Sequence, residues 1–331
     1  MVLTRGLLSA AAAVVLACGS AQASEIVIYT GGAPTGEGST YHQGMGKAVE
    51  EQLEKIAKPY GYKVRRIPSN GAVANAEACA KVEDRICFGI GQGGLTYAPV
   101  ESGETVIARQ DLPGECAMAF TAEHSLRNWA SVVENAARVT FVVPKNSGSQ
   151  AFVEKLFATD PALEGVTPNF EFKSGQDAII ESVKHGGRGR LGIFYAYPNP
   201  TSGLINAAAD AHMRVIGVLS PAVAKTDETY YLNRRAPYQL AWLGLGETRT
   251  VRAMCTKAML FHGNVDAIPN EWTREDAAKI VAEMKALPAS AFVPQDGPLA
   301  SLMKRVEQLA DEYDINDMVA DLEEQALQMI D

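Results

Sequence analysis

Residues 62–92 read YKVRRIPSNGAVANAEACAKVEDRICFGIGQ, and this stretch decides the predicted fold. The run Tyr62–Ile67 predicts a strand, the turn Pro68–Gly71 ends it, and the alanine-rich run Ala72–Val82 predicts a helix. Ile86–Ile90 is a second short apolar run, which predicts another strand. A strand, a helix and a strand in this order predict a right-handed crossover between parallel strands.

The alternation of strands and helices continues on both sides of this stretch. Upstream, Glu25–Thr30 predicts a strand, a loop rich in glycine, proline, serine and threonine follows, and Tyr41–Ile56 keeps a helical spacing of its apolar residues. After Trp129 the alternation restarts, which predicts a second α/β lobe. Its predicted strands are Arg138–Val143, Phe170–Lys173, Leu191–Tyr195 and Arg214–Val218, and its predicted helices are Gln150–Phe157, Gln176–Lys184 and Thr201–Ala211.

Two longer strand-like segments, Val106–Thr121 and Val251–Phe261, separate the two halves. We interpret them as antiparallel connections that leave the first lobe and return to it, and such a pair acts as a hinge. The sequence therefore predicts an α/β protein with two Rossmann-like lobes joined by a two-strand hinge. The predicted domains are a first lobe of residues 24–110 plus 256–331 and a second lobe of residues 111–255. Two further helices are predicted to pack on the first lobe, one opened by Thr273 and one over Pro298–Met329.

The first residues have the features of a secretion signal. Arg5 precedes the uncharged run Leu7–Ala17, and Ala21–Ala23 offers a small-residue cleavage site. Residues 1–23 are therefore predicted to be a signal peptide, and the mature protein is predicted to be periplasmic. The alternative is a lipid anchor at Cys18, because the residues before it loosely resemble a lipoprotein box.

The composition narrows the class of function. The chain of 331 residues has a net charge of −9 and no block of lysine or arginine, which argues against nucleic acid as a partner. The sequence contains no Cys-x-x-Cys or His-x-x-x-His spacing for a metal, no Gly-x-Ser-x-Gly elbow and no P-loop. We therefore expect no metal and no cofactor, and a binding protein is favoured over an enzyme.

Four cysteines follow the predicted signal peptide: Cys79, Cys87, Cys116 and Cys255. An even number in an oxidising compartment favours two disulfides, for which three connectivities exist. Spacing alone does not choose between them. The short separation favours a Cys79–Cys87 pair, which would leave Cys116 for Cys255, and free buried thiols are the alternative for that second pair.

Five segments with glycine turns follow one another in a familiar order. They are Thr30–Gly32, Gly38–Tyr41 leading into Gly44–Ala48, Pro68–Ala76, Phe88–Gln92 and Val143–Ser149. In order and spacing they resemble the type II periplasmic solute-binding proteins, most closely the TAXI family of TRAP transporter receptors. The resemblance covers the whole mature chain. It implies a monomer that captures a small molecule in the cleft between its lobes and delivers it to inner-membrane transporter subunits.

The chain departs from that family in two places near the expected cleft. The first turn is longer, because Ala33–Glu37 is inserted. After Gln92 the chain has Gly93 and Gly94, where the family commonly has a serine and an aspartate. Both changes argue against carrying over the family's usual small-carboxylate ligand, and a related transport system or a less polar cargo is the alternative.

The candidate ligand-binding residues lie mainly in turns. Ligands of open α/β sheets bind at the carboxyl ends of the strands, and helix starts there offer unpaired backbone N–H groups to an anion. Tyrosines add an apolar ring with a polar tip, and a carboxylate near the hinge would accept a hydrogen bond from a ligand. The candidates are Thr30, Gly31, Ser39, Thr40, Tyr41, Ser69, Asn70, Gln92, Glu115, Ser147, Ser149, Gln176, Tyr195, Tyr197 and Asn199.

Each candidate also has a simpler interpretation. Serine, threonine and asparagine cap helices in every class of protein, tyrosines pack in cores, and Glu115 would equally suit the surface. Arg109, Arg188 and Arg190 would suit a bidentate contact to an anion, with solvent exposure as the alternative for the last two. Other functions compatible with the same fold are a periplasmic sensor and a carrier of lipid or hydrophobic cargo.

Overall fold

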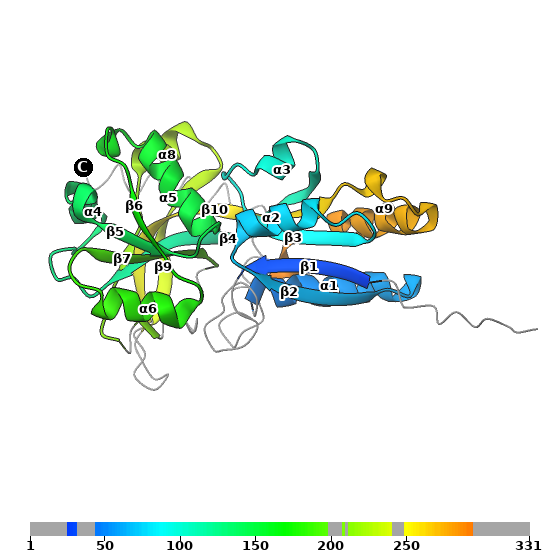
Figure 1. The fold of residues 1–331 in the computed structure, drawn as a ribbon, viewed down its shortest axis with the longest axis horizontal. Coiled ribbons are helices and arrows are strands. Elements are labelled where there is room, and N and C mark those ends of the chain that lie inside the picture. Colours follow the sequence, from blue (N-terminus) through cyan, green and yellow to red (C-terminus); the bar gives the residue numbers. More distant parts are fainter. Residues whose placement is uncertain (1–24, 32–43, 198–206, 209–210, 240–247, 294–331) are drawn as a thin grey trace, which may run out of the picture.

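The fold is taken from a computed structural model that describes residues 25–31, 44–197, 207–208, 211–239 and 248–293. The predicted signal peptide with Cys18, most of the predicted helix Thr201–Ala211 and the predicted helix Pro298–Met329 lie outside these residues. The described elements fall into two lobes, and two long strands run through both of them (Figure 1).

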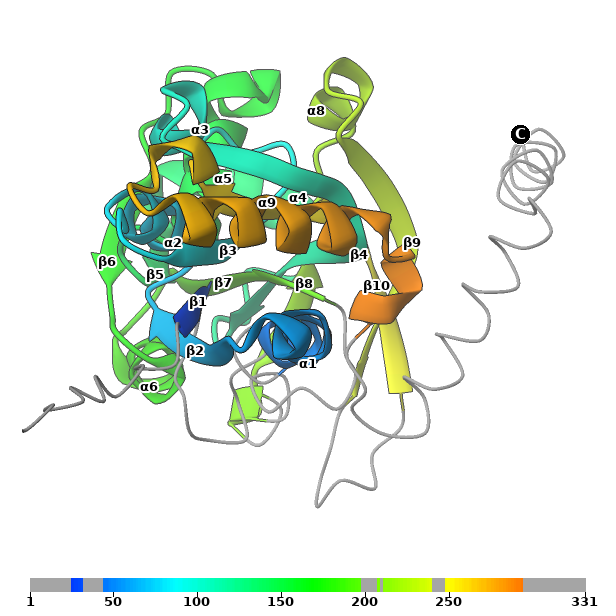
Figure 2. The same ribbon diagram turned by 90° about the vertical axis from the view of Figure 1, so that its right-hand side faces the viewer.

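Lobe 1 is built on three parallel strands, as the sequence predicts. Strands β1 (Glu25–Gly31), β2 (Lys63–Ser69) and β3 (Ile86–Gln92) lie in the order β2-β1-β3. The helices of this lobe are α1 (Gly46–Ala57), α2 (Ala72–Ala80), α3 (Ala98–Glu101) and α9 (Glu271–Ala286). Figure 2 shows α1 and α2 on opposite sides of these strands. Residues Val49 and Leu53 of α1 are fully buried because their spacing of four places them on one helix face.

Lobe 2 repeats this construction. Strands β5 (Thr140–Val143) and β6 (Asn169–Phe172) pair in parallel, and β7 (Arg190–Ala196) pairs in parallel with β5 on its other side. The helices of this lobe are α4 (Trp129–Glu134), α5 (Gly148–Thr159), α6 (Gln176–His185) and α8 (Pro221–Thr226).

Short 3-10 helices occur in both lobes and cover Lys58–Tyr60, Ala136–Arg138, Pro161–Leu163, Val265–Ala267 and Ala289–Phe292.

The two lobes share one sheet, because β4 (Thr105–Thr121) and β10 (Thr248–Gly263) run through both. They pair with each other in antiparallel fashion, which confirms the predicted direction of the two connections. β10 pairs with β3 in lobe 1, and β4 pairs with β7 in lobe 2. The ladder is irregular between the lobes, since Gly114 pairs with Lys257, Leu112 pairs with Ala258, and Pro113 bulges between them. The predicted domain boundaries after residues 110 and 255 stay a prediction.

Two disulfides join the four cysteines. Cys79 at the end of α2 bonds to Cys87 in β3, which ties a helix to its own sheet. Cys116 in β4 bonds to Cys255, its direct partner in β10, so this bridge links the two strands that cross between the lobes. The connectivity is the one that the short Cys79–Cys87 separation favoured.

Some predicted elements differ from the observed ones. Helix α9 is capped by Asn270, whose Oδ1 accepts the backbone N–H of Thr273 at 3.0 Å, so the prediction that Thr273 opens the helix is wrong. β8 (Arg214–Gly217) does not extend the parallel series, because it pairs antiparallel with β4. β9 (Tyr230–Gln239), an antiparallel partner of β10, was not predicted, since its mixed polar sequence has no period-two pattern.

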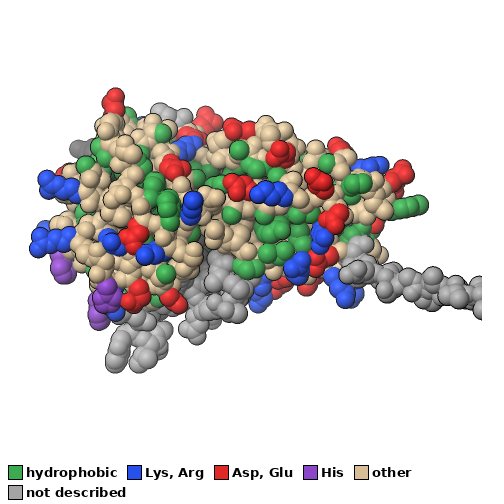
Figure 3. All heavy atoms as spheres, viewed as in Figure 1, with side chains coloured by type: hydrophobic (Ala, Val, Ile, Leu, Met, Phe, Trp, Pro, Cys, Tyr) green, Lys and Arg blue, Asp and Glu red, His purple; other side chains and the backbone are tan. Residues whose placement is uncertain are grey.

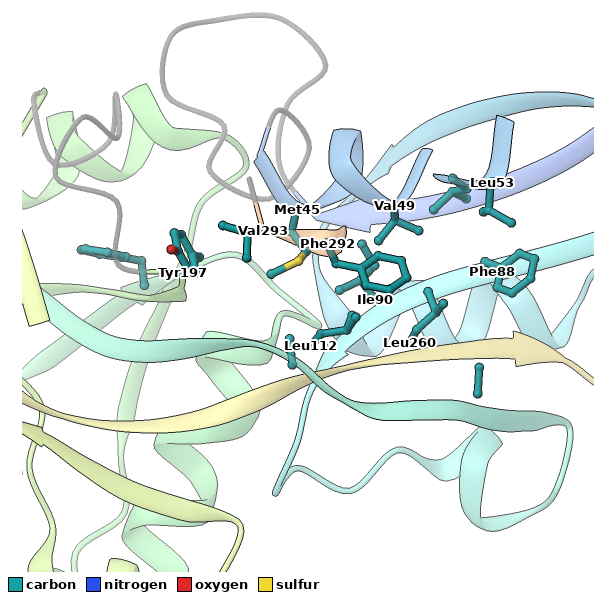
Figure 4. Packing of buried hydrophobic residues seen from close by; sticks show 14 of the residues in the cluster. Met45, Val49, Leu53, Phe88, Ile90, Leu112, Tyr197, Leu260, Phe292 and Val293 are labelled. Carbon is teal, nitrogen blue, oxygen red and sulfur yellow. The ribbon is translucent and has the colours of Figure 1, made fainter. Parts of the chain in front are cut away.

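Two hydrophobic cores run along the two faces of the sheet, and each draws residues from both lobes. The first core contains Met45 and Val293 of lobe 1 together with Tyr197 of lobe 2, which Figure 4 shows at one end of the packed side chains. The second core contains Tyr97 of lobe 1 and Phe152 of lobe 2. Apolar packing on both faces therefore continues from one lobe into the other.

The surface seen in Figure 3 carries lysine and arginine interspersed with aspartate and glutamate. Among the helices that the structure describes, none combines the length and the apolar character needed to cross a bilayer.

Candidate functional site

The candidate site lies where the carboxyl ends of the lobe 1 strands meet lobe 2. The turn after β2 and the turn after β5 come into direct contact there. A Cβ atom added to Gly71, the residue before α2, would lie 3.0 Å from the Cα atom of Ser147, the residue before α5. Gly71 also has a φ of 133°, which residues with a side chain rarely adopt. Both the close contact and the backbone conformation therefore require glycine at this position.

A backbone hydrogen bond joins the two turns. The N–H group of Ala74, in the first turn of α2, donates to the carbonyl oxygen of Asn146 at 3.2 Å. Asn146 has a left-handed φ of 57°, a conformation that asparagine tolerates better than most residues. One of the amides that α2 leaves unpaired at its N-terminus is thus satisfied by lobe 2.

The serines at these turns have local partners. Ser147 caps α5, because its Oγ accepts the backbone N–H of Gln150 at 3.1 Å and donates to the Pro144 carbonyl at 2.7 Å. Ser69 accepts the backbone N–H of Gly71 at 3.0 Å. Helix capping and turn formation, the simpler interpretations, account for these contacts, and ligand binding by the two serines stays a prediction.

Three of the predicted site residues meet at the centre of the lobe interface. Gln92 ends β3, and its Nε2 donates to Glu115 Oε2 at 2.8 Å and to the Tyr195 carbonyl oxygen at 3.4 Å. A Cβ atom added to Gly148, the first residue of α5, would lie 2.8 Å from Gln92 Cδ. The side chain of Gln92 therefore fills the space that Gly148 leaves open.

Glu115 is fully buried, so the alternative of a surface position is wrong. Tyr97 and Tyr195 surround it, and burial is the main cause that raises the pKa of each phenol well above 10, with the Glu115 charge as a further contribution. Both rings stay neutral across the physiological range. Tyr97 Oη accepts the backbone N–H of Gln92 at 2.9 Å and donates to the Gln92 carbonyl at 3.1 Å, which fixes the end of β3.

The predicted tyrosines of lobe 2 lie on opposite faces of the sheet. Tyr195 belongs to the second core, with its ring centroid 4.7 Å from that of Phe152. Tyr197 belongs to the first core and faces Val293 and Met45 (Figure 4). Both tyrosine rings therefore pack in hydrophobic cores, and they do not line the same side of a cleft.

The remaining candidates are distributed as follows. Thr30 is fully buried and Gly31 is buried, both at the end of β1, while Asn70 is exposed on the turn after β2. Ser149 lies in the first turn of α5, and Gln176 is the first residue of α6. Four candidates lie outside the described residues: Ser39, Thr40, Tyr41 and Asn199.

The candidate arginines lie away from the lobe interface or have structural partners. Arg109 forms a bidentate pair with Asp111 at 2.6 and 2.7 Å and donates to the carbonyl oxygens of Met284 and Leu287 at the end of α9. It therefore fixes α9 to β4, and the expectation of an anion contact is not met in this arrangement. Two other arginines lie at the amino end of β7, where Arg190 pairs with Glu171 and Arg188 is exposed.

A second set of contacts between the lobes was not predicted. Lys155 of α5 donates to the carbonyl oxygen of Gly94 in lobe 1 at 2.5 Å, and Tyr230 Oη donates to the same oxygen at 3.1 Å. The signal in the sequence is the Gly93–Gly94 pair, which stands where the resembled family commonly has a serine and an aspartate. A Cβ atom on Gly93 would lie 2.6 Å from the Lys257 carbonyl oxygen, so the close approach of two backbones explains this glycine.

No cluster of three or more histidine, cysteine, aspartate or glutamate side chains within the described ranges has an arrangement that would hold a metal ion. The site as described consists of backbone amides at two facing helix starts, a glutamine, a buried carboxylate and tyrosines. Groups of these kinds form hydrogen bonds and apolar contacts, and their binding of a ligand stays a prediction.

Comparison with known proteins shows similarity of fold only. No protein-family profile matches the chain, and no curated protein sequence matches it. Among solved structures it is similar to the periplasmic binding protein BugD, with 13% identity over 85% of each chain and a TM-score of 0.44. It is similar to R. palustris Rpa4515 with adipate, with 14% identity over 88% of this chain and 96% of that one and a TM-score of 0.43. It is also similar to the GluR0 ligand-binding core in complex with L-glutamate, with 12% identity over 81% of this chain and 98% of that one and a TM-score of 0.43.

Proposed function

We propose that this chain is an exported solute-binding protein, similar to TAXI receptors, which captures a small molecule between its lobes and delivers it to inner-membrane transporter subunits. One observation carries the proposal. The turns at Gly71 and Ser147, each at the carboxyl end of a parallel strand and each opening a helix, face one another across the two connecting strands. Such an arrangement brings two sets of helix N-termini to one place.

The connection between the lobes suits an opening and closing motion. Only β4 and β10 run through both lobes of the described structure, and their pairing shifts register at Pro113 and at two further places on the lobe 1 side of it. A proline within a strand removes a ladder hydrogen bond, and a bulge bends the strand locally. We place the hinge at this bulge. Opening there would separate Gly71 from Ser147 and expose a cleft beside these two turns, into which a solute would bind before the lobes close.

The chemistry of the interface favours a small ligand that carries an anionic group. The N-termini of α2 and α5 contribute positive dipole ends that favour a carboxylate or another anion. Tyr197, Met45 and Val293 pack in the core on the opposite face of the sheet, so they lie apart from these helix starts (Figure 4). A small carboxylate is therefore the first class of ligand to test.

The test is native mass spectrometry of the full-length protein purified from the periplasm without denaturation. We expect a bound small molecule in one-to-one ratio, which calorimetric titration with the identified compound would then confirm. Turnover of that compound during incubation would show an enzyme instead. A phospholipid or other long-chain lipid as the only bound compound would favour the carrier alternative. A protein that is empty after every such purification, and binds none of a carboxylate and amino acid library, would contradict the proposal.

A further inference from the structure

Two side chains of lobe 2 donate to one carbonyl oxygen of lobe 1, a third side chain pairs with one of the donors, and we name this group the Gly94 clasp. Lys155 Nζ and Tyr230 Oη both donate to the Gly94 oxygen, at 2.5 and 3.1 Å. Asp227 accepts from Lys155 Nζ at 2.5 Å and lies beside it in lobe 2. The clasp lies between the turn that follows β3 and the middle of α5, on the α2 face of the sheet.

The lobe 2 half of the clasp is held in place by contacts within its own lobe. Lys155 Nζ lies 4.9 Å from the centroid of the Tyr230 ring, a cation–π distance, and it is paired with Asp227. Asp227 Oδ1 accepts the Thr229 backbone N–H at 3.0 Å, and the Thr229 carbonyl accepts from Thr256 of β10 at 2.6 Å. These contacts orient the Lys155 and Tyr230 donors without any contribution from Gly94.

The lobe 1 side of the clasp lies against the crossing strand β10. The N–H of Gly93 donates to the Lys257 carbonyl of that strand at 2.8 Å, and Gly94 takes a left-handed φ of 73°. A Cβ atom on Gly94 would lie 2.8 Å from two ring carbons of Tyr230, so only glycine permits this approach. The backbone at Gly93 and Gly94 therefore points the Gly94 carbonyl oxygen toward Lys155 and Tyr230 of lobe 2.

Every bond of the clasp joins two protein groups, so none needs a solute in order to form. We infer that the clasp stabilises the closed arrangement of the lobes by itself, and that Lys155 is the positioning residue that sets the ratio of closed to open protein. The inference rests on the proposed function for its biological meaning, because a clasped protein holds a solute longer and releases it only after the clasp opens. A transporter that receives the solute would have to break these bonds.

The ratio of closed to open protein is measurable without any solute. The Ala74 N–H bonds to Asn146 across the lobe interface, so its hydrogen exchange requires the lobes to part. The Asn75 N–H bonds to Gly71 within lobe 1 and serves as the reference in the same helix. Exchange of full-length protein, dialysed free of solute, is followed at both amides by NMR or by mass spectrometry with residue resolution.

Four variants separate the clasp from general stability. Lys155→Met keeps most of the side-chain stem and removes the donor, and Tyr230→Phe removes the second donor. Lys155→Arg restores a cation that reaches the same acceptors. Lys173→Met is the matched control, because Lys173 pairs with Glu171 at 3.1 Å entirely inside lobe 2.

We expect Lys155→Met to lower the protection of the Ala74 amide about tenfold, the effect of losing one charge-assisted hydrogen bond. Tyr230→Phe should lower it less, and Lys155→Arg should return it toward wild type. Protection at Asn75 should stay unchanged in all variants, as should both amides in Lys173→Met. Unchanged Ala74 protection in Lys155→Met, or an equal loss at Asn75, would overturn the inference. Neither result depends on whether a solute is found, so a failure of the clasp and a failure of the proposed function are distinguishable.

Discussion

Replacing Gly148 by alanine should open the lobes without weakening either of them. Gly148 is the first residue of α5, where alanine is fully compatible with helical backbone. The added Cβ atom would lie 2.8 Å from Gln92 Cδ and overlap Gln92 Oε1. Because Gln92 belongs to lobe 1, the overlap exists only when the lobes are closed.

The magnitude follows from what Gln92 loses when it withdraws. Its Nε2 donates to the buried carboxylate of Glu115 at 2.8 Å. A hydrogen bond to a charged group contributes about 1.5–3 kcal/mol, which corresponds to roughly 10- to 150-fold in the ratio of closed to open protein. The same substitution restricts the unfolded chain and stabilises the fold by about 0.4–1 kcal/mol. Closure should therefore weaken while the melting temperature holds or rises.

The assay combines exchange of the Ala74 amide with differential scanning calorimetry. In Gly148→Ala, protection at Ala74 should fall by 10-fold or more, since this amide bonds to Asn146 across the interface. In a Gln92→Ala background the overlap is gone, so adding Gly148→Ala should change protection by less than about twofold. An equal effect of Gly148→Ala in both backgrounds, or a melting temperature that falls with the protection, would refute the reasoning.

Three further predictions concern stability. Ser147→Ala removes the α5 cap and should lower the free energy of unfolding by about 1 kcal/mol, measured by urea denaturation. Replacing Cys116 and Cys255 together by serine removes a bridge between residues 139 positions apart and should lower that free energy by up to about 5 kcal/mol on the same assay. Burial raises the pKa of Asp227, but its hydrogen bonds, that from Lys155 first among them, outweigh burial and hold the pKa below the usual value. A lowered pKa means that its contribution is present above about pH 4 and is lost as the pH falls below that value, so the free energy of unfolding of the wild type should decrease with acid on the same assay.

The controls for these three are specific. Ser147→Thr keeps a capping hydroxyl and should retain most of the stability, and a loss equal to that of Ser147→Ala would contradict the capping role. Double serine variants that unfold at the same urea concentration as wild type would show that the bridge adds nothing. The acid effect should be absent in Asp227→Asn, and an unchanged acid dependence there would assign it to another carboxyl group.

The order of strands and helices was predictable because each unit has its own local signals. The run Ile86–Ile90 and the turn Pro68–Gly71 predict β3 and the start of α2 without any knowledge of distant residues. The start of α9 was misplaced because Asn270 and Thr273 are both good capping residues, and only their hydrogen bond decides between them. β9 was missed because its stability comes from pairing with β10 and not from its own pattern.

The candidate site was predictable in position and less so in detail. That turns at strand ends would gather follows from parallel topology, and Gln92, Glu115 and Ser147 do lie at the lobe interface. Which atoms meet depends on side-chain packing, so the bond between Gln92 and Glu115 could not be foreseen. Lys155 gave no signal at all, since a lysine in the middle of an amphipathic helix is ordinarily solvated.

The position of β10 in the sheet has a consequence for the order in which the fold is completed. In lobe 1 the inner edge of β3 is covered by β10, where Gln92 lies opposite Ala258, and all of lobe 2 is synthesised between these two residues. The lobe that starts the polypeptide is therefore the last to be completed. Until the second crossing strand has paired, one edge of the apolar strand Ile86–Gln92 has no hydrogen-bonding neighbour, and during that interval newly made chains are most exposed to pairing with each other.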